Sequence, residues 1–180
     1  MAPPPTGAPP RPDGIEAAHE QLPATAWRRI RPLLSLLVLG AVMAWALSGR
    51  AGGRTADWTV ETPAAVLRIE APRIIRTGQF YETTVEVRAR RDIAQLAVAV
   101  EPGLWKDVTI NSTVPTPAEE SYAADRVRFS FDRLAAGETF VFKVDAQVNP
   151  SRWGTNTGTL ALLDGEAPLA ALPLSMRILP

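Results

Sequence analysis

The chain has 180 residues, with 19 basic and 19 acidic side chains and therefore no formal net charge. It has no cysteine, which excludes disulfides, thiol chemistry and iron–sulfur ligation. Its one histidine, His19, lies close to the N-terminus, so the remainder of the chain lacks the residue that histidine-based metal sites and Ser-His-Asp triads need.

Residues 1–27 form a proline-rich segment with few large apolar side chains. Such a segment cannot bury enough surface to offset the entropy that it loses on ordering. We therefore predict a disordered tail over residues 1–27, on the cytoplasmic side of a membrane. The prolines of this segment stand at positions 3, 4, 5, 9, 10, 12 and 23.

An almost unbroken apolar run follows, from Leu33 to Leu47, with Ser35 as its one polar residue. A helix needs roughly 17–25 mostly apolar residues to cross a bilayer, and arginines at its ends place their charges among the head groups. We predict one transmembrane helix over residues 28–49. Arginines are more frequent before it than after it, which favours a cytoplasmic N-terminus: Arg28, Arg29 and Arg31 upstream, Arg50 and Arg54 downstream.

A cleaved signal peptide is the competing interpretation of this run. Ala44-Trp45-Ala46 resembles the small-x-small site at which such peptides are cut. The long proline-rich segment before the arginines is unlike the short start of a signal peptide. An uncleaved anchor in the inner membrane is therefore the preferred interpretation.

Small residues recur every four positions in the predicted helix, at Gly40, Ala44 and Ser48. This spacing places them on one face, where small side chains let a second helix approach closely. The pattern predicts self-association or another helix–helix contact in the membrane. Its alternative is that an alanine-rich composition puts small residues in such positions by chance.

Residues 50–58 are expected to form a linker, because paired glycines at positions 52 and 53 give the backbone high flexibility. The linker is short, so the folded part is expected to stay close to the bilayer. Residues 59–180 are then one extracytoplasmic domain, long enough to bury a core of its own.

Apolar and polar residues alternate with a period of two through this domain, which predicts β-strands. In Tyr81–Ala89 the odd-numbered residues are expected to face the core. Asp164-Gly165 between two apolar runs predicts a short hairpin. The other expected strands lie around Leu67 and Ile69, Leu96 to Val100, Arg126 to Asp132, Phe140 to Asn149, Leu160 to Leu163 and Leu172 to Ile178.

Turn residues separate these runs about every dozen positions. Seven to eight short strands with one polar face each predict an all-β fold, an antiparallel immunoglobulin-like β-sandwich. The stretch from Asn111 to Asp125 is expected to be the longest irregular segment. A barrel would need more even strand lengths.

Two turns carry a resemblance to a known family. Thr77-Gly78-Gln79-Phe80 and Leu134-Ala135-Ala136-Gly137-Glu138-Thr139 each enter an alternating strand. They resemble the turns of bacterial immunoglobulin-like modules of the CARDB and DUF11 type. The resemblance covers about residues 64 to 180 and implies adhesion, spacing or scaffolding, with no enzymatic residues to carry over.

Three aromatic residues are the candidate interface: Trp105, Tyr122 and Trp153. Aromatic side chains displayed on loops are common anchors of protein interfaces. For each tryptophan the alternative is that it covers an open end of the core.

No arrangement of residues predicts catalysis, a metal site or a cofactor, and the 13 basic and 16 acidic residues from Thr55 onward do not form the basic field of a nucleic-acid binder. The sequence thus predicts a single-pass membrane protein whose outer domain binds a protein partner, as an accessory or scaffold subunit of an envelope complex. The alternative is a carbohydrate- or cell-wall-binding module in which the three aromatics line a sugar platform.

Overall fold

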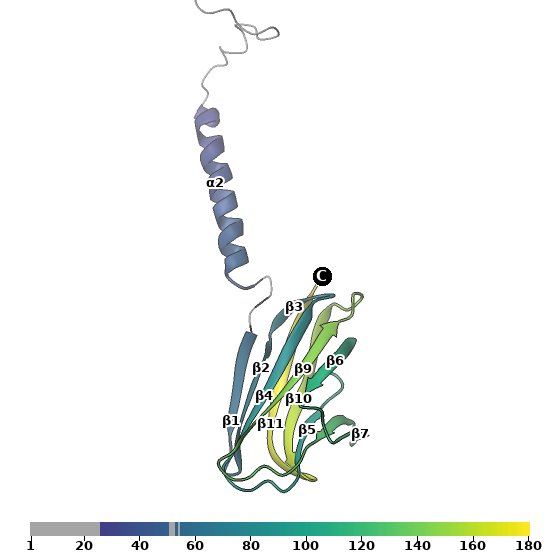
Figure 1. Cartoon of the computed structure of the whole chain (residues 1–180). Coiled ribbons are helices and arrows are strands. Elements are labelled where there is room, and N and C mark those ends of the chain that lie inside the picture. Colours follow the sequence, from purple (N-terminus) through teal and green to yellow (C-terminus); the bar gives the residue numbers. More distant parts are fainter. Residues whose placement is uncertain (1–25, 51–52, 54) are drawn as a thin grey trace, which may run out of the picture. The chain divides into compact units, whose positions relative to one another are not determined.

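The structure, a computed structural model, describes residues 26–50, 53 and 55–180. The chain divides into two units between Ala44 and Trp45. The predicted disordered tail lies outside the described residues except for its last two positions. Those two begin the helix α2, which extends from Ala26 to Leu47 (Figure 1).

Helix α2 ends where a glycine leaves the helical conformation. Gly49 has φ +72°, and the Ser48 N–H donates to the carbonyl oxygen of Trp45 in the last turn. A positive φ costs glycine little, which makes it a common residue just after a helix. The 22 residues span about 33 Å. By length and composition Ile30–Leu47 is able to cross a membrane, as an anchor or as a signal sequence.

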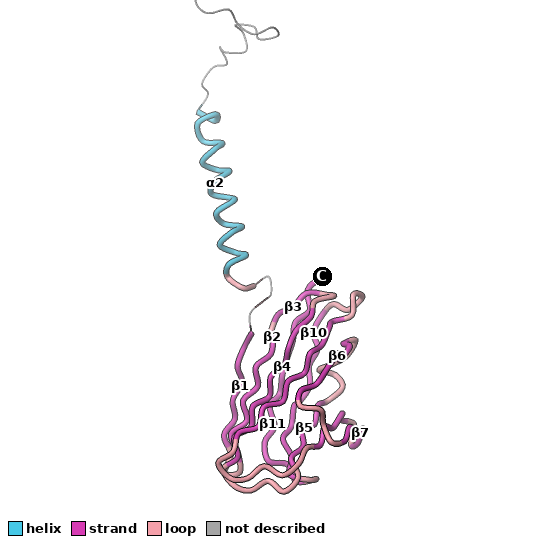
Figure 2. The backbone as a smooth tube through the Cα atoms, in the orientation of Figure 1, coloured by secondary structure: helices cyan, strands magenta, loops and turns pink. Residues whose placement is uncertain are grey.

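The remainder of the chain forms two stacked β-sheets, and most of its loops gather at the two ends of the stack (Figure 2). The first sheet has the order β1-β2-β4-β9-β6 and the second β3-β11-β10-β5-β8-β7. The strands are β1 (Thr55–Glu61), β2 (Ala65–Pro72), β3 (Ile74–Arg76), β4 (Phe80–Ala89), β5 (Leu96–Val100), β6 (Val108–Val114), β7 (Glu119–Ala123), β8 (Arg126–Ser130), β9 (Thr139–Val148), β10 (Gly154–Asp164) and β11 (Ala167–Leu179).

The predicted immunoglobulin-like sandwich is confirmed, and the seven strands placed from the alternation are all present. Four of the eleven described strands were not predicted: β1, β3, β6 and β7. All four are edge strands of their sheets. The pairing is antiparallel except between β3 and β11, which run parallel.

Strand β1 begins at Thr55, within the segment expected to be a linker. Trp58 and Val60 face inward and pack against the core, while Asp57 on the outer side pairs with Arg68 of β2 at 2.8 Å. The paired glycines favoured a flexible segment, but from Thr55 onward the side chains already alternate. The tether between α2 and the sandwich is therefore shorter than predicted.

The stretch from Asn111 to Asp125 was expected to be the longest irregular segment, and this expectation is wrong. Its first part completes β6, and Glu119–Ala123 forms β7. Ala124 and Asp125 have φ +50° and +57° and make a two-residue turn into β8. Positive φ at both positions matches the twist of a short hairpin, but alanine rarely signals it, so the turn was missed.

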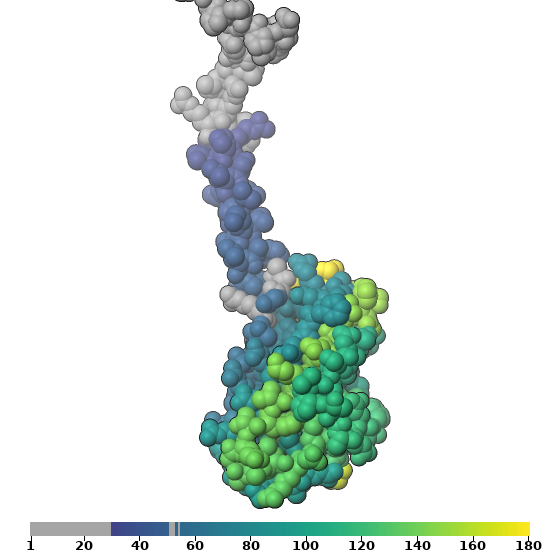
Figure 3. Space-filling model, in the orientation of Figure 1, coloured from purple at the N-terminus to yellow at the C-terminus, as the bar shows by residue number. Residues whose placement is uncertain are grey.

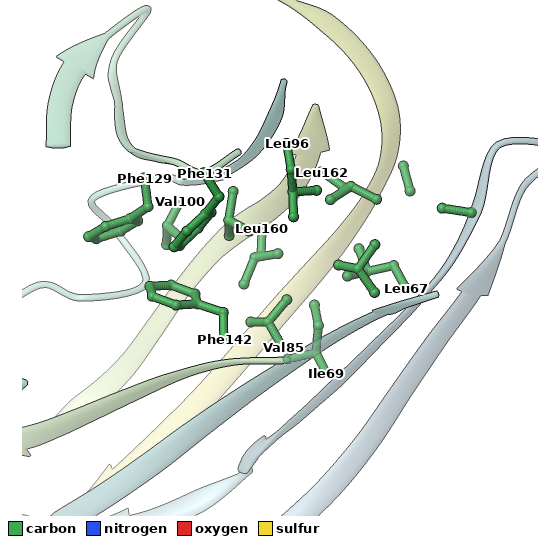
Figure 4. Close-up of a cluster of buried hydrophobic side chains, with 14 of the residues drawn as sticks. Leu67, Ile69, Val85, Leu96, Val100, Phe129, Phe131, Phe142, Leu160 and Leu162 are labelled. Atoms are coloured by element: carbon green, nitrogen blue, oxygen red, sulfur yellow. The ribbon is translucent and has the colours of Figure 1, made fainter. Parts of the chain in front are cut away.

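The core lies between the sheets and is rich in aromatic rings (Figure 4). Phe129 of β8 and Phe142 of β9 face each other with ring centroids 5.3 Å apart, and Phe131 contacts Phe142 at 5.0 Å. In β4 the inward residues are those that alternation predicted, and Val85 and Val87 are fully buried. Both sheets therefore contribute to one continuous cluster.

The two turns that resemble those of CARDB modules have a physical role. Gly78 has φ +75° and its N–H donates to the carbonyl of Val148, and Gly137 has φ +86° and its N–H donates to that of Ala89. The carboxylate of Glu138 accepts the Ala135 N–H at 2.8 Å. Each glycine thus allows a tight turn that ties two strands of the first sheet together.

Replacement of Phe142 by alanine tests the aromatic core. We expect Phe142→Ala to lower the free energy of unfolding by about 3–5 kcal/mol, because it removes a fully buried ring and leaves a cavity. Val141→Ala on the same strand changes a side chain that faces outward and should cost less than about 1 kcal/mol. Denaturant titration of both variants measures the difference, and equal losses would contradict this view of the core.

Asp92 supplies a pH-dependent contribution at the Gly137 turn. The Ala136 N–H donates to its carboxylate at 2.9 Å and Arg133 forms an ion pair with it, and these two interactions, in that order, lower the pKa of Asp92. A lowered folded-state pKa stabilises the fold above the unfolded value of about 4, and the contribution is lost as pH falls through the folded value.

Asp92→Asn should therefore lower the melting temperature at neutral pH and reduce its decline between about pH 5 and 3. Asp132→Asn is the matched control, since Asp132 is exposed in the same loop and has no hydrogen-bond partner among the described residues. The same steep decline in wild type and Asp92→Asn would contradict the prediction.

Candidate functional site

Trp105, the first candidate interface residue, belongs to the border of the core. It lies in the turn between β5 and β6 and is half-buried, with its ring edge-on to Phe129 at 5.8 Å. It also lines a small, partly open apolar hollow of about 20 Å³ together with Trp58 and Tyr81. Trp105 thus covers an open end of the core, which was the alternative to a role in an interface.

Tyr122 and Trp153 are exposed, but they lie on different elements. Tyr122 is 64% exposed on the edge strand β7, and Trp153 is 71% exposed in the loop before β10. The three aromatics therefore do not form one surface.

The predicted helix-packing positions are only partly helical. Gly40 and Ala44 lie in α2, whereas Ser48 lies one residue after its end and its hydroxyl donates to the carbonyl of Trp45 at 2.6 Å. A Cβ added at Gly40 would meet no atom within 4 Å. The surface is thus open for a second helix, and association through it stays a prediction.

The outer face of the first sheet is strongly charged, and Figure 3 shows it on the near side of the sandwich, with β9 and β6 in green. Its arginine, lysine and carboxylate side chains pair across neighbouring strands, as in Lys143–Glu82 at 2.9 Å. The pair lowers the pKa of Glu82, chiefly through the hydrogen bond from Lys143. Such a face is well solvated, and its charges are costly to desolvate.

The outer face of the second sheet differs, because its central strands expose small uncharged residues. Leu160 and Leu162 of β10 face the core, so the residues between them face outward, and the same holds for β11 around Leu174 and Met176. We call these outward residues the β10–β11 face. They are Thr155, Thr157 and Thr159 of β10 and Ala171, Pro173 and Ser175 of β11, whereas Ala161 of β10 is buried.

Arg128 borders this face and lies flat on the sheet. Its side chain is only 11% exposed, it forms an ion pair with Glu166, and its Nη2 donates to the carbonyl of Gly165 at 2.9 Å. Ala99, opposite Arg128 in the strand register, is also buried. The arginine therefore covers part of the sheet through its methylene groups as well as through its charge.

Glu101 closes the face on the side of β5. The backbone N–H of Thr159 donates to its carboxylate at 2.8 Å, and Arg126 pairs with it at 3.2 Å. These interactions, with the backbone hydrogen bond as the larger, lower the pKa of Glu101. The Glu101 carboxylate is thus bound by Thr159 and Arg126 at the edge of the β10–β11 face.

Among the described residues no group of three or more histidine, cysteine, aspartate or glutamate side chains is placed to hold a metal ion. The hollow of about 340 Å³ around Arg68 and Glu86 on the sandwich surface is open and lined mainly by charged side chains. The geometry offers contact surfaces, and the β10–β11 face is the least charged of them.

Sequence reasoning missed the β10–β11 face. The signal was present in the small residues of both strands, but it became readable only when the register joined them. No charged residue interrupts Gly154–Leu163 or Ala167–Met176.

No known family model matches the sequence, and no curated protein matches it. Solved structures do match. A CARDB domain from Pyrococcus furiosus, crystallised in complex with di-metal ions, shares 10% identity over 66% of this chain and 97% of its own, with a TM-score of 0.41. The solution structure of that domain shares 12% identity over 62% of this chain and 90% of its own, with a TM-score of 0.39.

A non-cellulosomal cohesin from the archaeon Archaeoglobus fulgidus matches at 9% identity over 61% of this chain and 88% of its own, with a TM-score of 0.41. CARDB domains are thus among the solved structures to which this chain is similar. At these identities the likeness concerns the fold and does not extend to ligands, partners or activity.

Arg128 provides a test of the border of the β10–β11 face. We expect Arg128→Ala to lower the free energy of unfolding by about 1–2 kcal/mol, because it uncovers apolar sheet and removes a hydrogen bond to Gly165. Arg88→Ala, at an exposed position of β4 without an ion-pair partner among the described residues, is the control and should be near neutral. Equal effects in thermal unfolding would contradict the covering role.

Proposed function

We propose that the chain is a single-pass, membrane-anchored scaffold module whose extracytoplasmic sandwich binds a protein partner, as an accessory subunit of an envelope complex. In this proposal the N-terminus is cytoplasmic and α2 stays uncleaved in the inner membrane. The observation that carries it is the contrast between the uncharged β10–β11 face and the charged outer face of the first sheet.

The β10–β11 face suits a protein surface for two reasons. Its threonine, alanine, proline and serine side chains have few rotamers to lose on contact, which keeps the entropic cost of binding low. It also lacks charges, and the buried centres of protein interfaces are depleted in charged residues.

A carbohydrate-binding module is the alternative, and the positions of the aromatic residues argue against it. A sugar platform needs several aromatic rings on one surface. Trp105 packs at the border of the core, while Tyr122 and Trp153 project from separate elements. No part of the described sandwich brings the three together.

The short tether supports a partner in or near the membrane. Seven residues separate the end of α2 at Leu47 from the start of β1 at Thr55. They span at most roughly 28 Å when fully extended. A sandwich held this close to an anchor would meet membrane proteins more often than free ones.

Site-specific photocrosslinking in intact cells tests the proposal. A photoreactive amino acid at Ala171, on the β10–β11 face, should give one discrete adduct with a membrane-associated protein. The matched control is Thr84, on the outer face of β4, which should give no adduct of comparable yield. Mass spectrometry of the adduct identifies the partner and, from the N-terminal peptides, shows whether α2 is retained.

Two results would contradict the proposal. Equal adducts at both positions would show that the β10–β11 face has no special role. Adducts to glycan in place of protein would favour the carbohydrate alternative.

A further inference from the structure

One end of the sandwich, which we call the tether end, holds the point where the chain enters the first sheet. It consists of the start of β1 and segments 73–79, 105–108, 149–153 and 177–180. The N–H of Gly53 donates to the carbonyl of Ile74 at 3.3 Å, so the tether itself joins this end. Figure 1 shows the C-terminus beside β3 at the same end.

Charge is distributed unequally between the two ends of the sandwich. The four segments of the tether end carry five basic side chains and one acidic one, Asp107. The turns of the opposite end, at 61–64, 90–95, 131–138 and 164–167, carry six acidic and three basic side chains. The basic residues of the tether end are Arg73, Arg76, Lys106, Arg152 and Arg177.

The basic residues of the tether end are also poorly paired. Within the described part of the chain, Arg73, Lys106 and Arg177 have no carboxylate within 4.0 Å. Arg152 lies 3.9 Å from Asp107, but its side chain is only 18% exposed and donates to Asn156 Oδ1. Six further ion pairs lie elsewhere on the sandwich. The arrangement leaves positive charge available at one end and neutralises it over most of the rest.

An exposed tryptophan stands among these cations. Trp153 is 71% exposed, and Phe80, at the start of β4, is 66% exposed at the same end. The loop of Trp153 is held in place, because the Thr77 hydroxyl donates to the carbonyl of Pro150 at 2.7 Å and the Arg152 N–H donates to that of Asn149 at 2.9 Å. The ring is therefore presented to solvent by a fixed loop.

We infer that the tether end is a membrane-contact surface that takes anionic lipid head groups, with Trp153 placed at the interface. Tryptophan favours the head-group level of a bilayer, and clustered arginine and lysine are attracted to anionic lipids. The inference rests on the anchoring part of the proposed function. The seven-residue tether then keeps this end within reach of the head groups.

The test uses the full-length chain, reconstituted into lipid nanodiscs. Because the chain has no cysteine, Ser151→Cys gives a single position for an environment-sensitive fluorophore beside Trp153. Ala136→Cys, an exposed position in the turn of Gly137 at the opposite end, is the matched control. The nanodiscs contain phosphatidylcholine alone or phosphatidylcholine with phosphatidylglycerol.

In nanodiscs with phosphatidylglycerol we expect the label at position 151 to shift to the blue and its quenching by iodide to fall severalfold relative to position 136. High salt should reverse the protection, because it screens the attraction between arginine and lipid. Combined Arg73→Glu and Arg177→Glu substitutions should reverse it as well. Equal quenching at both positions, with the chain embedded in the discs, overturns the inference and leaves the anchor intact.

Two other outcomes are decisive. Protection of position 151 that is the same in both lipids and insensitive to salt overturns anionic lipid as the occupant. A chain that does not enter nanodiscs at all overturns the anchor and this inference with it. The salt titration needs no further substitution, so the test holds even if the double arginine variant fails to fold.

Discussion

The contact between Phe129 and Phe142 joins the two sheets, and the surfaces of the molecule depend on it. These rings come from β8 of one sheet and β9 of the other, with Phe131 packed against Phe142. The chain has no cysteine, so no disulfide assists this packing. Burial of apolar surface must therefore hold the sheets together, and it fixes which residue of every strand points outward.

Once the inward residues are fixed, the two outer faces follow from the sequence and differ in chemistry. On the first sheet the outward positions are charged and pair across strands, as Lys143 does with Glu82. From Thr155 to Thr159 of β10 and from Ala171 to Ser175 of β11 the outward positions are small and uncharged. A charged face resists desolvation, whereas a face of small residues gives up little entropy on contact. The same core thus supports one solvated face and one suited to association.

The sequence allowed the central strands to be predicted and concealed the edges. Alternation is strong where both neighbours are strands, as in β4 and β9, since one face of each is fully buried. Strand β3 has only three residues, too few to show a period, and β1 alternates but follows paired glycines that favoured a flexible segment. The β10–β11 face could not be predicted, because small residues mark no pattern until the register places two strands side by side. Trp105 shows the same limit, since its contact with Phe129 joins residues far apart in the sequence.

The polarity of the ends arises from residues that are scattered along the chain. Arg73 follows β2, Arg152 precedes β10 and Arg177 lies near the end of β11. Antiparallel pairing brings these three positions to one end and sends the acidic turns to the other. A sandwich attached at its basic end would therefore meet an anionic bilayer with attraction at the near side and repulsion at the far side. Both effects would favour contact with the bilayer through the tether end. The β10–β11 face, which lies on the side of the sandwich, would then stay open to a neighbouring protein.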